Sequence, residues 1–379
     1  MAEAPENMPE GTNASDGREP AEAENRPNQI VVLRDYCTRV RGAACDRCAL
    51  ACPHDAISFA EDGRPVIDGD ACTRCGICLG ICDAFSSSRV TMIDVHARIR
   101  RIALRGEDVV LTCKENIFPG FEPAANVVVL PCLACLSPEF WTLVLTENIP
   151  VRIAADLAYC ADCERAGEMG EMLYAHAVET AEEWSGATVG YLDEIPEKEN
   201  LVRDLANPEG VDRRSAFTNL VADVGDIASG KRRLRNSDVL QQFYERKERA
   251  RARARLNLVD GVQFNDFVPQ GRTKHVMWPK RQLLLEAIDR NPEIAARVPV
   301  VLSETDCSRC TNELACAEAC LTGARFPSPE DGLLSYDPRY CIGCGLCVDA
   351  CPQQAVGLVE TTADAFARDE DENLEPPTD

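Results

Sequence analysis

The sequence lacks several features that would assign it to common classes of protein. No apolar run approaches the roughly 18 residues of a membrane-spanning helix, so no transmembrane segment is predicted. The first residues are acidic and polar, unlike a secretory signal, so we expect the protein in the cytoplasm. Glycine-rich nucleotide-binding patterns and a nucleophile elbow are absent, so no nucleotide or flavin site is predicted. Histidine is scarce, and His54, His96, His176 and His275 have no partners at metal-site spacing.

Charge is strongly one-sided, because 63 acidic and 40 basic residues give a formal net charge of −23. Part of this excess lies in residues 1–29 and 361–379, which lack hydrophobic periodicity and are predicted to be disordered acidic tails. The acidic balance argues against nucleic-acid binding and suits docking against a basic patch on a protein partner. The stretch 231–255 is basic instead. This favours a solvated helix or linker, and leaves open a docking surface for an acidic partner.

Cysteine, by contrast, is abundant, with 21 residues in a chain of 379. An odd number cannot be paired completely in disulfides, and the chain is too long for a small disulfide scaffold. In a reducing cytoplasm such thiols bind metals or carry out redox chemistry. The composition therefore predicts metal or redox sites.

The cysteines near the two ends form an internal repeat. Four of them at C-x2-C-x2-C-x3-C spacing run from Cys72 to Cys82, and four more run from Cys341 to Cys351. Each run follows a short strand-like segment that ends in Asp, and each is preceded by four cysteines at looser spacing. Three thiolates at this spacing surround one small loop and can reach three irons of a cubane cluster, while the fourth points away from it.

These runs, CTRCGICLGIC at 72–82 and CIGCGLCVDACP at 341–352, resemble bacterial two-cluster [4Fe–4S] ferredoxins. The segments CPHDAI at 52–57 and CPQQAV at 351–356 match the same family. A tetrathiolate zinc site is the alternative, but it usually uses two separated C-x2-C pairs. The resemblance covers about a third of the chain and implies an electron carrier with two domains of two clusters each.

The resemblance also implies crossed ligation, in which the last cysteine of one run completes the site of the other. The four implied quartets are Cys52, Cys72, Cys75 and Cys78; Cys37, Cys45, Cys48 and Cys82; Cys320, Cys341, Cys344 and Cys347; and Cys307, Cys310, Cys316 and Cys351. The gaps after Cys37 and Cys310 are longer than in the family. These loops suggest that two of the clusters differ from their neighbours in exposure and potential.

The middle of the chain has a different pattern. Apolar runs at 109–113, 127–132 and 151–160 each end in a cysteine, and helical patterns follow at about 137–147 and 164–184. Strands alternating with helices predict a small parallel α/β (Rossmann-like) unit. Cysteines at the carboxyl ends of parallel strands are expected to converge at one edge of the sheet.

Five cysteines belong to this middle unit. We expect Cys113, Cys132, Cys160 and Cys163 to hold a fifth cluster, and Cys135 to be spare. A structural zinc site and a redox-active dithiol are the alternatives, since two C-x2-C pairs suit both.

The predicted fold class is α+β, with two ferredoxin-like dicluster domains flanking the α/β unit and a helical segment. The expected boundaries are 1–29 (tail), 30–100 (dicluster domain), 105–195 (α/β unit), 196–300 (helical and basic segment), 301–360 (dicluster domain) and 361–379 (tail). The leading hypothesis is a non-catalytic electron carrier, a subunit or dedicated partner of a larger anaerobic redox enzyme. The alternatives are catalysis at the middle site and a redox sensor that acts through residues 231–255.

Overall fold

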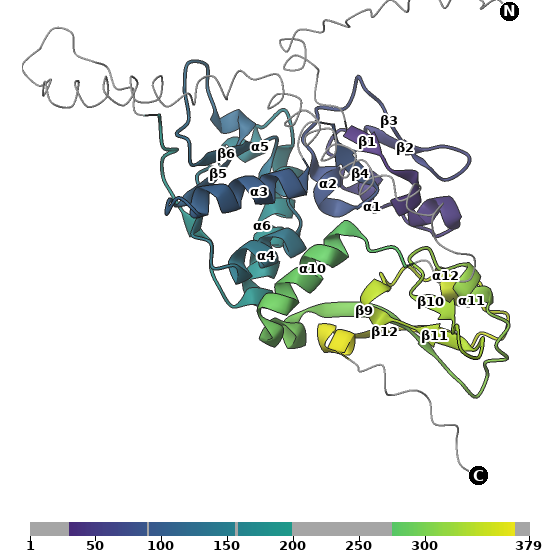
Figure 1. Cartoon of the computed structure of the whole chain (residues 1–379). Coiled ribbons are helices and arrows are strands. Elements are labelled where there is room, and N and C mark those ends of the chain that lie inside the picture. The colour runs from purple at the N-terminus through teal and green to yellow at the C-terminus, as the bar shows by residue number, and fades with distance from the viewer. Residues whose placement is uncertain (1–29, 89–90, 156–157, 199–274, 368–379) are drawn as a thin grey trace, which may run out of the picture.

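The computed structural model describes residues 30–88, 91–155, 158–198 and 275–367. Figure 1 shows an N-terminal part, a middle sheet with its helices, and a C-terminal part. The N-terminal and C-terminal parts are the cysteine-rich ones. Both acidic tails, except for residues 361–367, and the basic stretch 231–255 lie outside the described residues. None of the helices in these ranges is both long and apolar enough to cross a membrane.

The two cysteine-rich parts repeat one order of elements. The N-terminal part contains β1 (Ile30–Val32), α1 (Arg47–Leu50), β2 (Ile57–Phe59), β3 (Pro65–Ile67), α2 (Ile77–Ile81) and β4 (Phe85–Ser87). The C-terminal part contains β9 (Pro299–Thr305), α11 (Ala315–Glu318), β10 (Arg325–Pro327), β11 (Leu334–Tyr336), α12 (Leu346–Asp349) and β12 (Val356–Thr362). In each part the first and last strands pair antiparallel, and the two inner strands form a hairpin. The internal repeat of the sequence is therefore also a repeat of structure.

The C-terminal tail begins later than the sequence predicts. Thr361 and Thr362 still belong to β12, and the 3-10 helix η10 (Ala363–Ala367) follows. Phe366 is buried, with the Arg281 guanidinium 4.6 Å from its ring centre. The prediction of disorder for residues 361–367 was wrong, because acidic composition does not reveal a strand partner or a buried aromatic ring.

The middle part is a parallel sheet, as the alternation of strands and helices predicts. The strand order is β6-β5-β7-β8, with β5 (Val109–Cys113), β6 (Val127–Leu130), β7 (Val151–Ile153) and β8 (Gly190–Tyr191). The helices are α3 (Met92–Ala103), α4 (Pro138–Thr146), α5 (Ala158–Ala161) and α6 (Gly167–Ser185). Thr91 begins α3 with a capping box, and Ser137 caps α4. β7 ends at Ile153, so Cys160 lies on α5 rather than at the end of a strand, which corrects the prediction.

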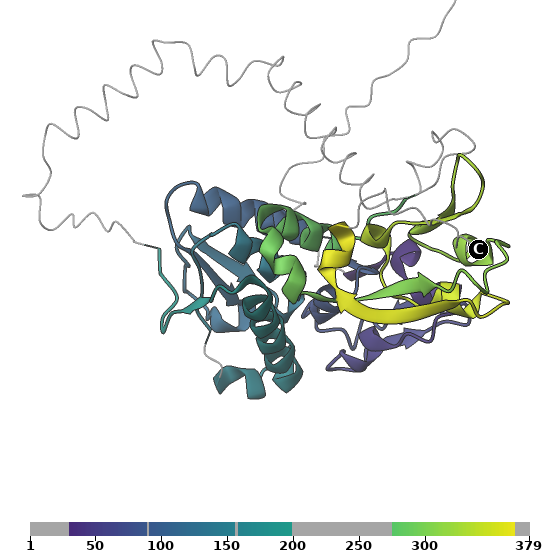
Figure 2. The same ribbon diagram turned by 90° about the horizontal axis from the view of Figure 1, so that it is seen from below.

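Helix α10 (Pro279–Arg290) connects the parts. It packs against α4, and both ribbon views place it between the middle sheet and the C-terminal strands (Figures 1 and 2). The 3-10 helix η8 (Pro292–Arg297) leads from α10 into β9. The core beneath includes the fully buried Phe140 and Trp141 of α4 together with Leu283 and Ala287 of α10. Burial of this apolar surface is the main force that holds the helix in place.

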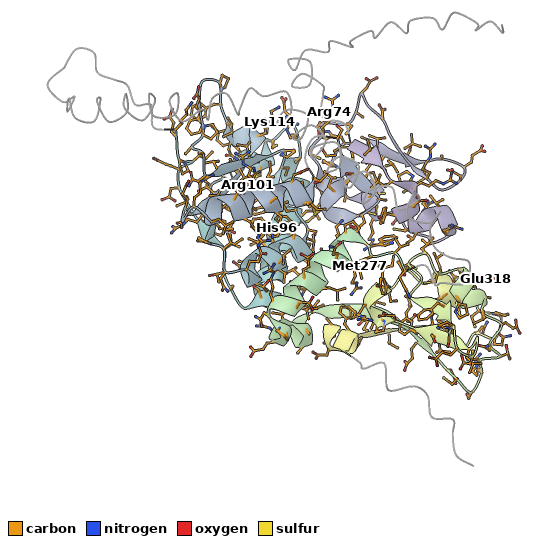
Figure 3. All side chains as sticks on the ribbon, viewed as in Figure 1. Arg74, His96, Arg101, Lys114, Met277 and Glu318 are labelled. Carbon is orange, nitrogen blue, oxygen red and sulfur yellow. The ribbon has the colours of Figure 1, made fainter. Side chains whose placement is uncertain are left out.

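A buried carboxylate adds polar contacts to this helix packing. Glu147, at the end of α4, is only 5% exposed. Its Oε2 lies 2.8 Å from Nε2 of His96, a residue labelled in Figure 3, and its Oε1 lies 2.9 Å from Nη2 of Arg290 on α10. One side chain therefore joins α3, α4 and α10.

Replacing Glu147 with Gln is expected to lower the free energy of unfolding by about 2 kcal/mol, because a charge-assisted hydrogen bond and an ion pair are weakened while their partners remain. Denaturation of the anaerobically prepared protein, followed by circular dichroism, measures the change. Asp289→Asn, at an exposed position of α10, serves as the control. Equal shifts in the two variants would count against a role for the buried contacts.

Candidate metal centres

Four cysteines of the C-terminal part line one pocket. Cys341 and Cys344 precede α12, Cys347 lies on it, and Cys320 comes from the loop after α11. Burial raises the pKa of the Cys344 thiol to about 11, and the charges of the other three cysteines act on it in the same direction. The structure thus brings together one quartet implied by the ferredoxin resemblance.

A second quartet lines the corresponding pocket of the N-terminal part. Its members are Cys52, Cys72, Cys75 and Cys78, and the fully buried Ile77 forms part of the wall. Burial raises the pKa of the Cys78 thiol, and the charges of the other three cysteines raise this pKa further. Such thiols must lose their protons to bind a metal, so a bound cation has to supply the compensating charge.

The third quartet gathers beside the second. Burial raises the pKa of Cys48 to about 11, and the cysteines whose charges raise it further are Cys82, Cys45 and Cys37. Cys37 and Cys48 are buried in one apolar cluster, with Cys82 packed against it. All four predicted members are therefore neighbours.

The fourth quartet is brought together in part. Burial raises the pKa of Cys316, and Cys351 and Cys310 are among the charges that act on it. Cys307 is exposed, with its Sγ 3.8 Å from the carbonyl oxygen of Thr305. This thiol lies at the surface of the molecule, so its place in the quartet stays a prediction.

Backbone amides are directed at several of these sulfurs. Three N–H groups donate to cysteine Sγ atoms: Ala56 to Cys52 at 3.3 Å, Ala84 to Cys82 at 3.4 Å, and Ala355 to Cys351 at 3.3 Å. Gly76 and Gly345, at φ of 82° and 80°, turn the chain into α2 and α12 just before Cys78 and Cys347. Hydrogen bonds to sulfur are one of the factors that set a cluster's reduction potential.

The middle cysteines also converge. Cys113, Cys132, Cys160 and Cys163 line one pocket between the ends of β5 and β6 and the start of α6. Burial raises the pKa of Cys132 to about 12, and the charges of Cys113 and Cys160 raise it further. Cys135 is buried and does not line this pocket. The predicted set of four is thus assembled, although Cys160 reaches it from a helix.

The middle pocket adjoins the N-terminal quartet of Cys52, Cys72, Cys75 and Cys78. The Arg165 side chain donates from Nη1 to the carbonyl oxygen of Thr73 at 2.7 Å and pairs through Nε with Glu115 at 2.8 Å. The Thr73 hydroxyl in turn donates to the carbonyl oxygen of Arg165 at 2.7 Å. These contacts join the loop after Cys72 to the loop after Cys163.

A close backbone approach holds the same junction. A Cβ added at Gly80 would lie 2.3 Å from the carbonyl oxygen of Ala134. Gly80→Ala is therefore expected to push α2 away from the Cys132–Cys135 turn, at a cost of about 1–3 kcal/mol, and to reduce metal occupancy of the middle site. Metal analysis and denaturation of the variant measure both effects. Gly69→Ala, which would meet nothing within 4 Å, is expected to change neither.

Sequence reasoning missed the basic side chains around these sites. Arg165 and Arg281 contact cysteine-bearing loops, and Arg325 lines the pocket of Cys341 and Cys344. Aligning the two repeats identifies Arg325, because it stands five residues after Cys320 where Ile57 stands five residues after Cys52. No sequence pattern marks the other two.

Two of the quartets and the middle set line pockets. Four thiolates on one zinc would each lie about 2.3 Å from it. Within the ranges that the structure describes, no three Cys, His, Asp or Glu side chains are drawn together so as to hold a single metal ion.

Comparison with known proteins matches one of the cysteine runs to a family of known function. The model of the 4Fe-4S binding domain matches residues 334–356, which include Cys341, Cys344, Cys347 and Cys351. This segment is a ferredoxin-type 4Fe-4S binding domain, and the prediction of iron–sulfur chemistry is confirmed. No solved structure matches the chain.

Three curated proteins are distantly similar to parts of the chain. Protein NrfC of Escherichia coli (strain K12) is 28% identical over 93 residues, 20% of this chain and 41% of that protein. The NrfC homolog of Haemophilus influenzae is 30% identical over 100 residues, 22% of this chain and 44% of that protein. A tetrathionate reductase subunit of Archaeoglobus fulgidus is 43% identical over 49 residues, 13% of this chain and 23% of that protein. The chain spans less than half the length of each of these relatives.

Proposed function

We propose that the chain is an electron-transfer subunit in which five [4Fe–4S] clusters form one conducting path. The observation that carries the proposal is the gathering of cysteines into three quartets, part of a fourth and a middle set, next to a matched 4Fe-4S binding segment. When bound, such clusters accept and release single electrons, and the protein sets their spacing and potential. The cysteines that would hold each cluster are those named above for each quartet and for the middle set.

Within each outer part, one ligand of each site lies on or just after the same short helix. Cys78 lies on α2 and Cys82 at its end, so the ligands of neighbouring sites alternate along one helix. Cys347 likewise lies on α12, and Cys351 follows its C-cap residue, Ala350. This spacing supports direct electron exchange within each pair.

Helix α10 brings the two pairs together. Lys280 donates from Nζ to the carbonyl oxygen of Leu79 at 2.9 Å, and its backbone N–H donates to Oδ1 of Asp83 at 3.1 Å. The next residue, Arg281, donates from Nη2 to the carbonyl oxygen of Cys341 at 2.7 Å. Two consecutive side chains therefore contact the cysteine-bearing loops of both outer parts.

Apolar packing also holds the N-terminal and C-terminal parts together. Trp278 is buried, and its ring lies 5.5 Å from that of Tyr36 in an edge-to-face arrangement. Leu321 and Ile342 of the C-terminal part pack against the same cluster, which also contains Cys37. Met277, labelled in Figure 3, immediately precedes Trp278. This packing supports a path from the Cys37 quartet to the Cys341 quartet.

The proposed electron path begins at the middle site and continues through the Cys75 quartet and the Cys48 quartet of the N-terminal part. It then passes to the Cys344 quartet and ends at the Cys316 quartet of the C-terminal part. The middle pocket and the exposed Cys307 lie at opposite ends of this order. We propose that redox partner proteins, as subunits of an oxidoreductase complex, exchange electrons with these two ends. The similarity to a named subunit of tetrathionate reductase supports membership of a reductase complex, and a cytoplasmic location stays a prediction.

Metal analysis of the full chain, purified without oxygen, tests the proposal. We expect about 20 irons per chain, an equal amount of labile sulfide, and electron paramagnetic resonance signals of several interacting clusters after reduction. An iron content near four, or substantial zinc, would contradict it.

A further inference from the structure

Arg325 is a fully buried cation in the C-terminal part. The residue is 2% exposed at the start of β10. Its Nε donates to the Ser303 hydroxyl at 3.0 Å, its Nη1 donates to the Thr305 hydroxyl at 2.6 Å, and the guanidinium lies 5.0 Å from the ring centre of Tyr336. In the described residues no carboxylate forms an ion pair with it. Hydroxyls and an aromatic ring orient the guanidinium, but they do not balance its charge.

The charge lies between two cysteine quartets. Arg325 lines the pocket formed by Cys320, Cys341, Cys344 and Cys347. The Arg325 side chain also interacts with Cys316, which belongs to the adjacent quartet. A permanent cation thus lies beside the thiols of both sites.

A cluster held by four thiolates suits this environment. Such a cluster carries net negative charge, and reduction adds one more negative charge. A cation in a poorly solvated interior interacts strongly with that added charge, because the effective dielectric constant there is low. Arg325 therefore favours the reduced form of its neighbours and raises their reduction potential.

The N-terminal part has no charge at the equivalent position. Ile57 is the first residue of β2, as Arg325 is of β10, and the two residues hold the same register position in their hairpins, opposite Ile67 and Tyr336. Ile57 lines the pocket of the Cys75 quartet, as Arg325 lines that of the Cys344 quartet. The repeat therefore differs at one matched place, with an apolar side chain in one part and a cation in the other.

We propose that Arg325 makes the C-terminal pair of clusters the higher-potential pair, so that electrons flow from the N-terminal part toward the C-terminal part. The nearby cations Lys280 and Arg281 do not remove this difference in charge between the N-terminal and C-terminal parts. Lys280 is balanced by Asp83, with 3.6 Å between Nζ and Oδ1, and Arg281 contacts the Cys341 loop. The inference rests on the proposed function, and it assigns that function a direction.

The test is a redox titration of the full anaerobic chain, followed by electron paramagnetic resonance. Arg325→Ile copies the N-terminal repeat, and Arg325→Gln removes the charge but keeps a polar side chain. Each variant is expected to raise the oxidised-to-reduced ratio of one C-terminal cluster at least tenfold at a fixed potential, about 59 mV for one electron. Arg325→Lys, which keeps the charge, is expected to stay much nearer the wild-type value. Unchanged potentials in the two uncharged variants, with all clusters present, would overturn the inference while leaving the proposed function intact.

Loss of iron from the uncharged variants is also informative. In that case the missing signals should be those that the wild-type chain reduces first, at the highest potential. The inference is overturned if the missing signals are those reduced last. A wild-type chain without iron–sulfur signals would instead contradict the proposed function itself.

Discussion

A chain carrying Cys132→Ala is expected to lose one metal site, while the matched Cys135→Ala chain keeps it. Cys132 lines the middle pocket with Cys113, Cys160 and Cys163. Cys135 follows three residues later, is buried, and lies beside Gly76, where an added Cβ would be 3.1 Å from the Cys135 Cβ. Because metal binding is coupled to folding, the Cys132 variant is also expected to denature more easily.

Elemental analysis of the two variants separates the alternatives for this site. A cubane predicts a loss of about four irons from about 20 in the Cys132 variant. A structural zinc predicts the loss of one zinc with no change in iron, and a dithiol predicts no loss of metal. Equal iron loss from both variants would show that the division between Cys132 and Cys135 is wrong.

Replacing Trp278 with Ala is expected to cost about 3–5 kcal/mol and to weaken the junction between the two outer parts. The indole is 6% exposed and packs edge-to-face on Tyr36, in a cluster that Leu321 and Ile342 join from the C-terminal part. Its removal leaves a cavity between the Cys37 and Cys341 quartets. We therefore expect full iron content but slower electron equilibration between the N-terminal and C-terminal clusters.

Rapid mixing with a reductant, freezing and electron paramagnetic resonance measure this equilibration, and denaturation measures the stability. Trp278→Phe keeps most of the apolar contact and is the matched control, with a smaller expected effect on both. If the Ala and Phe variants equilibrate at the same rate as the wild type, electrons do not pass through this junction.

Much of the candidate chemistry was predictable because its determinants are local. Three cysteines within one loop share a site whatever the rest of the chain does, so spacing identified the run from Cys341 to Cys351, which the family match confirms. The parallel middle sheet was also predictable from the sequence, since its β-branched runs alternate with helices. The prediction that Cys160 ends a strand was wrong, because β7 ends at Ile153 and Cys160 lies on α5.

The sequence by itself determined the two C-x2-C-x2-C-x3-C runs and the repeat of the outer parts, since both are visible in spacing over a few residues. Only the tertiary structure decided how the sites follow one another and where charge lies among them. Arg165 and Thr73 are 92 residues apart, and Lys280 and Leu79 are 201 apart, yet each pair is hydrogen-bonded. Such contacts depend on how α2, α6 and α10 pack, and packing of distant segments leaves no periodic trace in the chain.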